Sequence, residues 1–161
     1  MADTFEPIPP RNRRLRVLAV SSSGGHFVQL LHICAAFDRH NVSFATTSDT
    51  HRSEVGSSRF HLLPDANRGT LMKLGCLVTR IAWVVLKVRP DVVVSTGAAP
   101  GLFALAFGRL IGARTIWVDS IANPAELSMS GKKAGRFAQV WLTQWQNLAR
   151  PDGPTYVGSV V

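Results

Sequence analysis

The sequence is poor in the features that stabilise small secreted or metal-binding domains. Its only cysteines are Cys34 and Cys76, and each lies in an apolar, helix-like stretch. Neither stretch has the repeated ligand spacing of a zinc site, and two distant cysteines do not make a disulfide framework. The D-x-D motif of metal-bound sugar nucleotides is also absent. We therefore expect no metal and no resident cofactor.

Long apolar runs are missing as well. The sequence has no stretch of roughly 18 or more uncharged apolar residues, so no membrane-spanning helix is predicted. Its first residues, MADTFEPIPPRNRR, lack the apolar core of a signal peptide, and their prolines and charges predict a flexible basic arm over residues 1–14. We therefore expect a protein at the cytoplasmic face of the membrane, held there peripherally.

Acidic side chains are few. The chain has 10 Asp and Glu against 18 Lys and Arg, which gives a formal charge of +8 and favours an anionic partner such as phosphate, nucleic acid or acidic lipid. Basic residues interleaved with base-stacking aromatic residues are lacking, so we expect no nucleic-acid partner. With 46% hydrophobic and 17% charged residues, the composition is that of a globular chain, and residues 15–161 suit a single domain.

Short aliphatic runs alternate regularly with helical patterns along the chain. Predicted strands span 15–21, 42–47, 60–63, 91–95, 114–119, 138–143 and 155–157, and predicted helices span 26–37, 70–88 and 102–111. The pair Arg89-Pro90 ends the second helix, because the residue before proline avoids the helical conformation. Strands separated by helices predict an α/β fold with a doubly wound parallel sheet. Ligands of such sheets bind at the carboxyl ends of the strands.

A turn rich in serine and glycine follows the first predicted strand. Ser23, Gly24 and Gly25 permit close backbone approach, and the amides at a helix N-terminus attract phosphate or carboxylate. The turn lacks the third glycine of a dinucleotide fingerprint, although Asp49 lies near the position of a ribose-binding acid. The pattern predicts an anion site. An ordinary tight turn and a nucleotide-dependent oxidoreductase remain alternatives.

His26 begins the helix that follows this turn. A neutral imidazole takes a proton from a hydroxyl near pH 7, so His26 is a candidate general base. A histidine that only caps the helix or contacts phosphate has the same sequence pattern. The residues alone do not separate these two roles.

The longest helical pattern spans residues 70–88. Lys73, Arg80 and Lys87 recur every seven residues on one side, while Trp83 and aliphatic residues such as Leu77 cover much of the remainder. An apolar helix with basic edges is typical of a membrane interface, and the arginines of the N-terminal arm favour contact of these five residues with an anionic surface. A core helix with three solvated basic residues has the same periodicity and remains an alternative.

Another polar segment follows the predicted strand 114–119. Asp119 and Ser120 close this strand, and residues 128–133 form a loop with two hydroxyls, a glycine and two lysines. Such groups bind phosphate or sugar hydroxyls, although a helix cap with exposed lysines explains the segment equally simply.

Five short motifs occur in order: VLAVSSSGGH, PDVVVSTG, IWVDS with SMSGK, LTQWQ, and YVG. In their order and spacing the chain resembles the ALG-fourteen-like oligosaccharide biosynthesis proteins, which include the bacterial PssD-type subunits of exopolysaccharide and capsule assembly. The resemblance covers residues 15–158. It implies a Rossmann-like domain equivalent to the N-terminal half of a MurG-type GT-B glycosyltransferase.

The resemblance also implies a function shared between two chains. A separate C-terminal-half subunit carries most of the UDP-sugar site, whereas the subunit like this chain supplies the polyprenyl-diphosphate-linked acceptor at the membrane. The chain would then be a glycosyltransferase subunit that is inactive without its partner. A non-catalytic scaffold or enhancer of a partner glycosyltransferase is the alternative. The tail 154–161 lies where the linker of a fused enzyme would begin, which makes it a candidate partner interface.

Site residues follow by analogy with MurG-type enzymes. His26 is the first candidate base for attack of an acceptor hydroxyl on a UDP-sugar, and Asp119 is the second. The implied substrate-binding residues are Ser23, Gly24, Gly25, Gly97, Ser120, Ser128, Ser130, Gly131 and Lys132.

Overall fold

The computed structural model describes residues 13–65 and 71–160. Its centre is a seven-stranded sheet in the order β3-β2-β1-β4-β5-β6-β7, in which every pair of neighbours is parallel. The strands are β1 (Arg16–Val20), β2 (Asn41–Thr46), β3 (Arg59–Leu62), β4 (Val92–Ser95), β5 (Arg114–Val118), β6 (Val140–Thr143) and β7 (Thr155–Tyr156). The predicted α/β fold with a doubly wound parallel sheet is confirmed.

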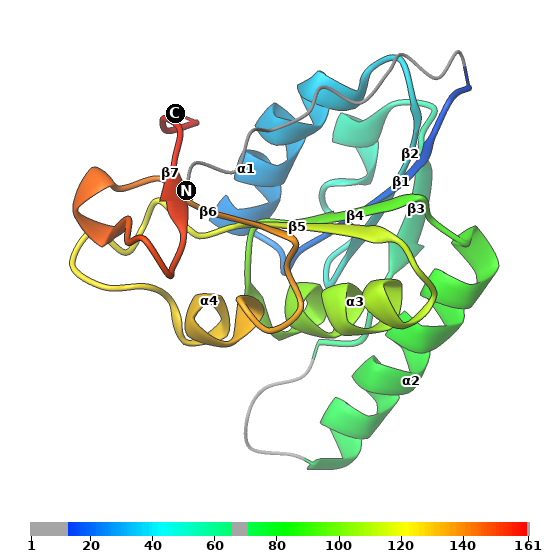
Figure 1. Cartoon of the computed structure of the whole chain (residues 1–161). Helices are drawn as coiled ribbons and strands as arrows, with labels where there is room; N and C mark the ends of the chain where they lie inside the picture. The colour runs from blue at the N-terminus through cyan, green and yellow to red at the C-terminus, as the bar shows by residue number, and fades with distance from the viewer. Residues whose placement is uncertain (1–12, 66–70, 161) are drawn as a thin grey trace.

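Helices cover both faces of the sheet (Figure 1). On one face lies α1 (Gly25–Cys34), and on the other lie α2 (Leu71–Val88), α3 (Ala98–Leu110) and α4 (Met129–Ala134). Short 3-10 helices span Ala35–Phe37 (η1), Arg52–Val55 (η2) and Gln146–Leu148 (η3). Strand β1 shows why both faces are covered: Val17 and Ala19 pack in the core under α1, while Leu18 and Val20 pack in the core under α2 and α3. Successive side chains of a strand point to opposite faces, so a strand that carries apolar side chains on both faces needs helices on both.

Two segments predicted as loops are partly helical. The segment between the predicted strand 91–95 and the predicted helix 102–111 is a shorter loop than expected, because α3 (Ala98–Leu110) already begins at Ala98. The segment 128–133 forms most of α4, and the Ser128 hydroxyl caps this helix by accepting a hydrogen bond from the amide of Gly131. Helix α4 is short and has few apolar residues, so it carries little periodicity, which is why the sequence pattern missed it.

Helix α2 packs one side against the core. Its buried residues are Leu77, Ile81, Val84, Val85 and Val88. The side chain of Leu77 is only 1% exposed, so its predicted membrane contact is wrong. The reason is that α2 is apolar over most of its circumference, so its apolar residues lie on two sides. Those on one side pack in the core, and those on the other side are exposed. The helix ends at Val88, and Arg89 has a φ of 46°, outside the right-handed helical region that the following proline disfavours.

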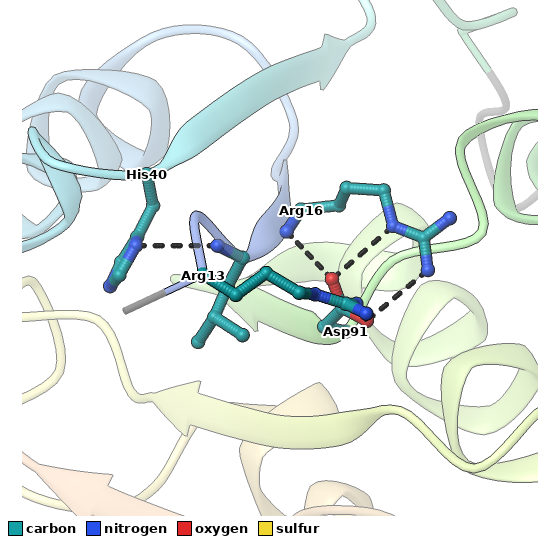
Figure 2. Close-up of polar contacts among 5 residues, drawn as sticks. Arg13, Arg16, His40 and Asp91 are labelled. Carbon is teal, nitrogen blue, oxygen red and sulfur yellow. Dashed lines mark hydrogen bonds and ion pairs between the residues drawn. The ribbon is translucent and has the colours of Figure 1, made fainter. Parts of the chain in front are cut away.

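The start of the described chain is fastened at the amino ends of the strands. Arg13 and Arg16 both contact the Asp91 carboxylate, at 2.9 and 3.2 Å, and Asp91 also accepts the backbone N–H of Arg16 (Figure 2). Residues 1–12 of the predicted basic arm lie outside the described residues. Arg13 and Arg16 therefore stabilise the junction of β1 and β4, at the edge of the sheet opposite to the carboxyl ends of the strands.

The Asp91 junction gives a pH-dependent contribution to stability. The hydrogen bond from Arg16 lowers the pKa of Asp91 to about 2, so its stabilising effect is complete above the ordinary carboxyl pKa and is lost as the pH falls toward 2. Because both arginines are largely exposed, we expect Asp91→Asn to cost about 1 kcal/mol of unfolding free energy at pH 7. Urea unfolding at several pH values measures this difference, which should shrink below about pH 4. A constant difference down to pH 3 would contradict the assignment.

Candidate functional site

The candidate site lies where the sheet reverses its winding. Strands β1 and β4 are neighbours, yet the chain leaves β1 for α1 on one face and leaves β4 for α3 on the other. The turns after the two strands diverge and leave a crevice, which is the usual ligand position in open α/β sheets. The turn Ser21–His26 follows β1, and Thr96-Gly97 follows β4. The site predicted from the glycine turn is therefore at the topological switch point.

His26 is held by the turn that follows β4. Its Nδ1 lies 3.2 Å from the carbonyl oxygen of Thr96, and the Thr96 hydroxyl donates to the His26 carbonyl oxygen at 2.6 Å. A carbonyl oxygen only accepts hydrogen bonds, so Nδ1 carries the proton. The other ring nitrogen, Nε2, is then an unprotonated acceptor in the neutral ring. This is the tautomer that a general base requires.

Gly97 gives the His26 ring its place. A Cβ atom at Gly97 would lie 2.6 Å from the ring atoms Cε1 and Nδ1, so only glycine allows this packing. Gly97 has a φ of 150°, and the next residue, Ala98, has a φ of 62°, a conformation that residues with a side chain rarely adopt. Strain of this kind is typical of functional turns. Gly97 was predicted to bind substrate, and in the structure it gives the His26 ring its position.

The glycine turn leaves two amides open. The amide of Ser23 donates to Thr47 Oγ1 at 3.1 Å, and the amide of Gly24 donates to His51 Nε2 at 3.3 Å. Among the described residues, the amides of Gly25 and His26 donate no hydrogen bond. These are the first amides of α1, where the helix dipole favours an anion. In the predicted anion site, the donors that remain available to an anion are therefore the backbone amides of Gly25 and His26.

Asp119 is buried and fully engaged. Its side chain accepts hydrogen bonds from Trp117 Nε1 at 3.1 Å, the Ser128 amide at 2.9 Å and the Ser128 hydroxyl at 2.6 Å. The residue is 1% exposed, and Gly131 packs against its carboxylate with no room for a Cβ. A base must reach the hydroxyl that it deprotonates. The geometry therefore gives Asp119 a structural role, that of fixing the start of α4, and not the predicted role of second base.

The other predicted binding residues divide into two groups. Ser128 and Gly131 serve the Asp119 contacts, and buried Ser120 accepts the Ala122 amide at 3.2 Å. Lys132 points to Glu126, with 2.6 Å between Nζ and Oε2. Ser130 instead lines a groove of about 600 Å³ together with Lys133. Of the two adjacent lysines, it is Lys133 that faces this groove.

The groove extends along the carboxyl edge of the sheet on the side of α2, α3 and α4. Its apolar lining comes from α2 and α3 and from Met129 of α4. Its polar lining comprises Ser22, Thr47, Asp65, Ser130 and Lys133. Ser22 belongs to the glycine turn, so the groove adjoins the candidate anion site. An apolar trough beside an anion site suits a ligand with an apolar and a phosphorylated part.

Sequence reasoning missed Thr96, Thr47 and His51. All three reach the turn from segments that are distant along the chain, and no local pattern marks them. Position after a strand was the available signal, since Thr96 directly follows β4 and Thr47 directly follows β2. Cys34, by contrast, is no reactive group, because burial raises the pKa of its thiol to about 12.

Comparison with known proteins adds one relative in sequence. No protein-family model matches the chain. The UDP-N-acetylglucosamine transferase subunit ALG14 of Candida albicans is 25% identical over 150 residues, which cover 78% of this chain and 68% of that protein. This weak homology supports the resemblance to ALG-fourteen-like proteins.

Solved structures match the fold. MurG of Acinetobacter baumannii gives a TM-score of 0.73 at 14% identity over 90% of this chain and 46% of that one. UDP-N-acetylglucosamine 2-epimerase of Rickettsia bellii gives 0.64 at 14% identity over 84% and 40% of the two chains. The chain thus spans less than half the length of these structures. The predicted Rossmann-like fold, equivalent to the N-terminal half of a GT-B glycosyltransferase, is confirmed, and the similarities support a glycosyltransferase-related subunit.

Proposed function

We propose that the chain is the acceptor-side subunit of a two-chain UDP-sugar glycosyltransferase that adds a sugar to a polyprenyl-diphosphate-linked acceptor. The observation that carries this proposal is the arrangement at the switch point: an unprotonated Nε2 on His26 stands beside two open amides of a glycine turn. A base beside an anion site suits an acceptor that has both a hydroxyl to activate and a diphosphate to hold.

The reaction would proceed as a displacement. The acceptor hydroxyl attacks the anomeric carbon of the donor, the bond from that carbon to the UDP oxygen breaks, and His26 Nε2 takes the hydroxyl proton. The amides of Gly25 and His26 hold the acceptor diphosphate, and Ser23 shapes the turn through its bond to Thr47. The groove beside Ser22 and Lys133 receives the first part of the polyprenyl chain. No metal enters the scheme.

The donor would be bound mainly by a second polypeptide. The chain spans 46% of MurG, and we assign the other half of such a two-domain enzyme to a second polypeptide. The relative of 25% identity is named as a transferase subunit, which supports a partner chain and makes UDP-N-acetylglucosamine the first donor to test. Strand β7 is an edge strand of the sheet, and an exposed tail follows it. In this tail the Val160 amide donates a hydrogen bond to Gln144 Oε1 at 2.9 Å. We place the partner interface at this tail.

Partner dependence tests the proposal. Transfer from UDP-N-acetylglucosamine to a polyprenyl-diphosphate-sugar acceptor is measured with this chain alone, with a C-terminal-half partner alone, and with both. We expect transfer only when both are present, because the base and the donor site are on different chains. Full activity of the partner alone with a soluble acceptor would instead favour the alternative function, a non-catalytic membrane scaffold or enhancer. Equal activity of this chain alone and with its partner would contradict the two-chain proposal.

Helix α2 supports attachment to an anionic membrane surface. On its exposed side, Trp83 is 45% exposed and lies between two cations, with Arg80 Cζ and Lys87 Nζ each 4.5 Å from the ring centroid. Lys73, Leu71, Met72 and Leu86 are also exposed. Cationic side chains around an amphipathic aromatic ring are typical of membrane interfaces. Among residues 13–65 and 71–160, no helix has the length and apolar character needed to cross a bilayer.

Vesicle binding tests the membrane contact. Replacing Arg80 and Lys87 by glutamine is expected to lower the partition coefficient onto vesicles with anionic lipid by about thirtyfold, at about 1 kcal/mol for each basic residue. The matched control replaces Arg136 and Arg150, two exposed arginines outside α2, and removes the same charge. Co-sedimentation at fixed ionic strength gives the comparison. Equal losses for the two pairs would show that net charge alone, and not α2, controls binding.

A further inference from the structure

The two glycines of the turn at the candidate site do not by themselves restrict its backbone conformation. Gly24 has a φ of 74° and is followed by a second glycine, so two successive residues have wide conformational freedom. A Cβ atom placed on either glycine would contact nothing within 4 Å. Within residues 13–65 and 71–160, no side chain packs against this face of the turn, which leaves it open to a ligand. Contacts on the opposite side of the turn must therefore fix its backbone conformation.

The segment after β2 provides this fixing. Thr47 accepts the Ser23 amide, and His51 accepts the Gly24 amide, so consecutive amides are bound by residues that begin and end one short loop. Both bonds engage these amides with the loop that follows β2. Because they orient the backbone directly ahead of α1, the next two amides, of Gly25 and His26, remain free and are directed at the ligand.

His51 is prepared for this contact by its neighbours. A backbone N–H only donates, so the bond from Gly24 requires an unprotonated Nε2, and Nδ1 then carries the ring proton. That proton faces the carboxylate of Glu54, with 2.8 Å between Nδ1 and Oε1. The ring is stacked on Phe27 of α1, with centroids 4.7 Å apart and an interplanar angle of 23°. Glu54 thus sets the tautomer, and Phe27 sets the plane of the ring.

We infer that His51 is a positioning residue for diphosphate binding: through its Nε2 it fixes the Gly24 amide and thereby presents the amides of Gly25 and His26 to the ligand. This inference deepens the proposed function and rests on it. His51 itself does not contact the reacting atoms. Its effect is to remove the conformational freedom of the double glycine before the ligand arrives, which lowers the entropic cost of binding.

A matched pair of variants separates the hydrogen bond from the packing. His51→Phe retains an aromatic ring to stack on Phe27 and loses the acceptor, whereas His51→Gln retains an acceptor near the position of Nε2. The probe is farnesyl diphosphate, titrated calorimetrically into the full chain, with farnesol as the control that lacks the diphosphate. We expect His51→Phe to weaken diphosphate binding about five- to tenfold, the effect of about one hydrogen bond, and His51→Gln to restore most of it.

The outcomes are distinct. If His51→Phe binds farnesyl diphosphate as tightly as the wild type at an equal melting temperature, the inference is overturned and the proposed function stands. If the wild type binds farnesyl diphosphate no better than farnesol, the anion site and the inference both fall. Should His51→Phe fail to fold, Glu54→Ala serves instead, because Glu54 is exposed and packs in no core cluster. Its loss frees the His51 ring and should weaken binding in the same direction, while unchanged binding overturns the inference.

Discussion

Replacing His26 by alanine is expected to reduce turnover of the two-chain enzyme by about two to four orders of magnitude. The reason is that Nε2 is the only ring nitrogen left to accept the acceptor's proton, since Nδ1 donates to the carbonyl oxygen of Thr96. Affinity for the acceptor should change only a few-fold, because the amides that bind the diphosphate belong to the backbone. Single-turnover kinetics with saturating acceptor measure the chemical step separately from binding.

His26→Asn is the matched control for this prediction. The side-chain amide of asparagine can donate to the Thr96 carbonyl in place of Nδ1, but it provides no group at the position of Nε2. We expect it to preserve the melting temperature and to lose as much turnover as His26→Ala. A loss of only a few-fold in both variants would leave His26 as a residue that binds or caps, and the base would have to come from the partner chain.

Replacing Asp119 by alanine is expected to lower the free energy of unfolding by about 2 to 4 kcal/mol. The substitution leaves the Trp117 indole N–H and the Ser128 amide without their buried acceptor, and it empties the space against which Gly131 packs. Chemical denaturation measures the loss. Ser120→Ala is the control, since this adjacent buried hydroxyl accepts one hydrogen bond, from the Ala122 amide, and should cost about 1 kcal/mol or less.

Asp119→Asn separates a structural role from a catalytic one. Every group around the carboxylate donates, so an amide nitrogen there would face another donor and the variant should also be destabilised. The folded fraction at low temperature should nevertheless retain its turnover, because His26 is intact. A stable Asp119→Asn variant that has lost turnover would instead restore Asp119 as a base.

The contrast between His26 and Asp119 shows how far sequence carries a site prediction. His26 was found because strand, glycine turn and helix are adjacent along the chain, and local order places a residue at a helix start. Asp119 has an equally suggestive position after a strand, yet its chemistry depends on Trp117, Ser128 and Gly131, which surround it only in the folded chain. The sequence does not show whether an aspartate is exposed or buried, and this difference decides whether it can act as a base.

Helix α2 shows the same limit for a surface. The periodicity of its basic residues predicted one exposed side correctly, but it assigned Leu77 to the membrane when this residue is in the core. A helix that is apolar over most of its circumference does not reveal which stripe meets the sheet. Lys132 was named for binding from the sequence, yet Lys133 is the lysine that lines the groove, because adjacent helical residues point about 100° apart.

By itself the sequence determined the order of strands and helices, the doubly wound parallel sheet, and the position of the glycine turn with its histidine. These depend on local periodicity and on glycine's conformational freedom, which are properties of neighbouring residues. Only the tertiary structure decided which nitrogen of His26 is free, which two amides of the turn remain open, and that His51 and Thr47 hold the others. Hydrogen bonds between segments 24 to 70 residues apart fix these features, and such contacts exist only once the sheet has brought the carboxyl ends of β1, β2 and β4 together.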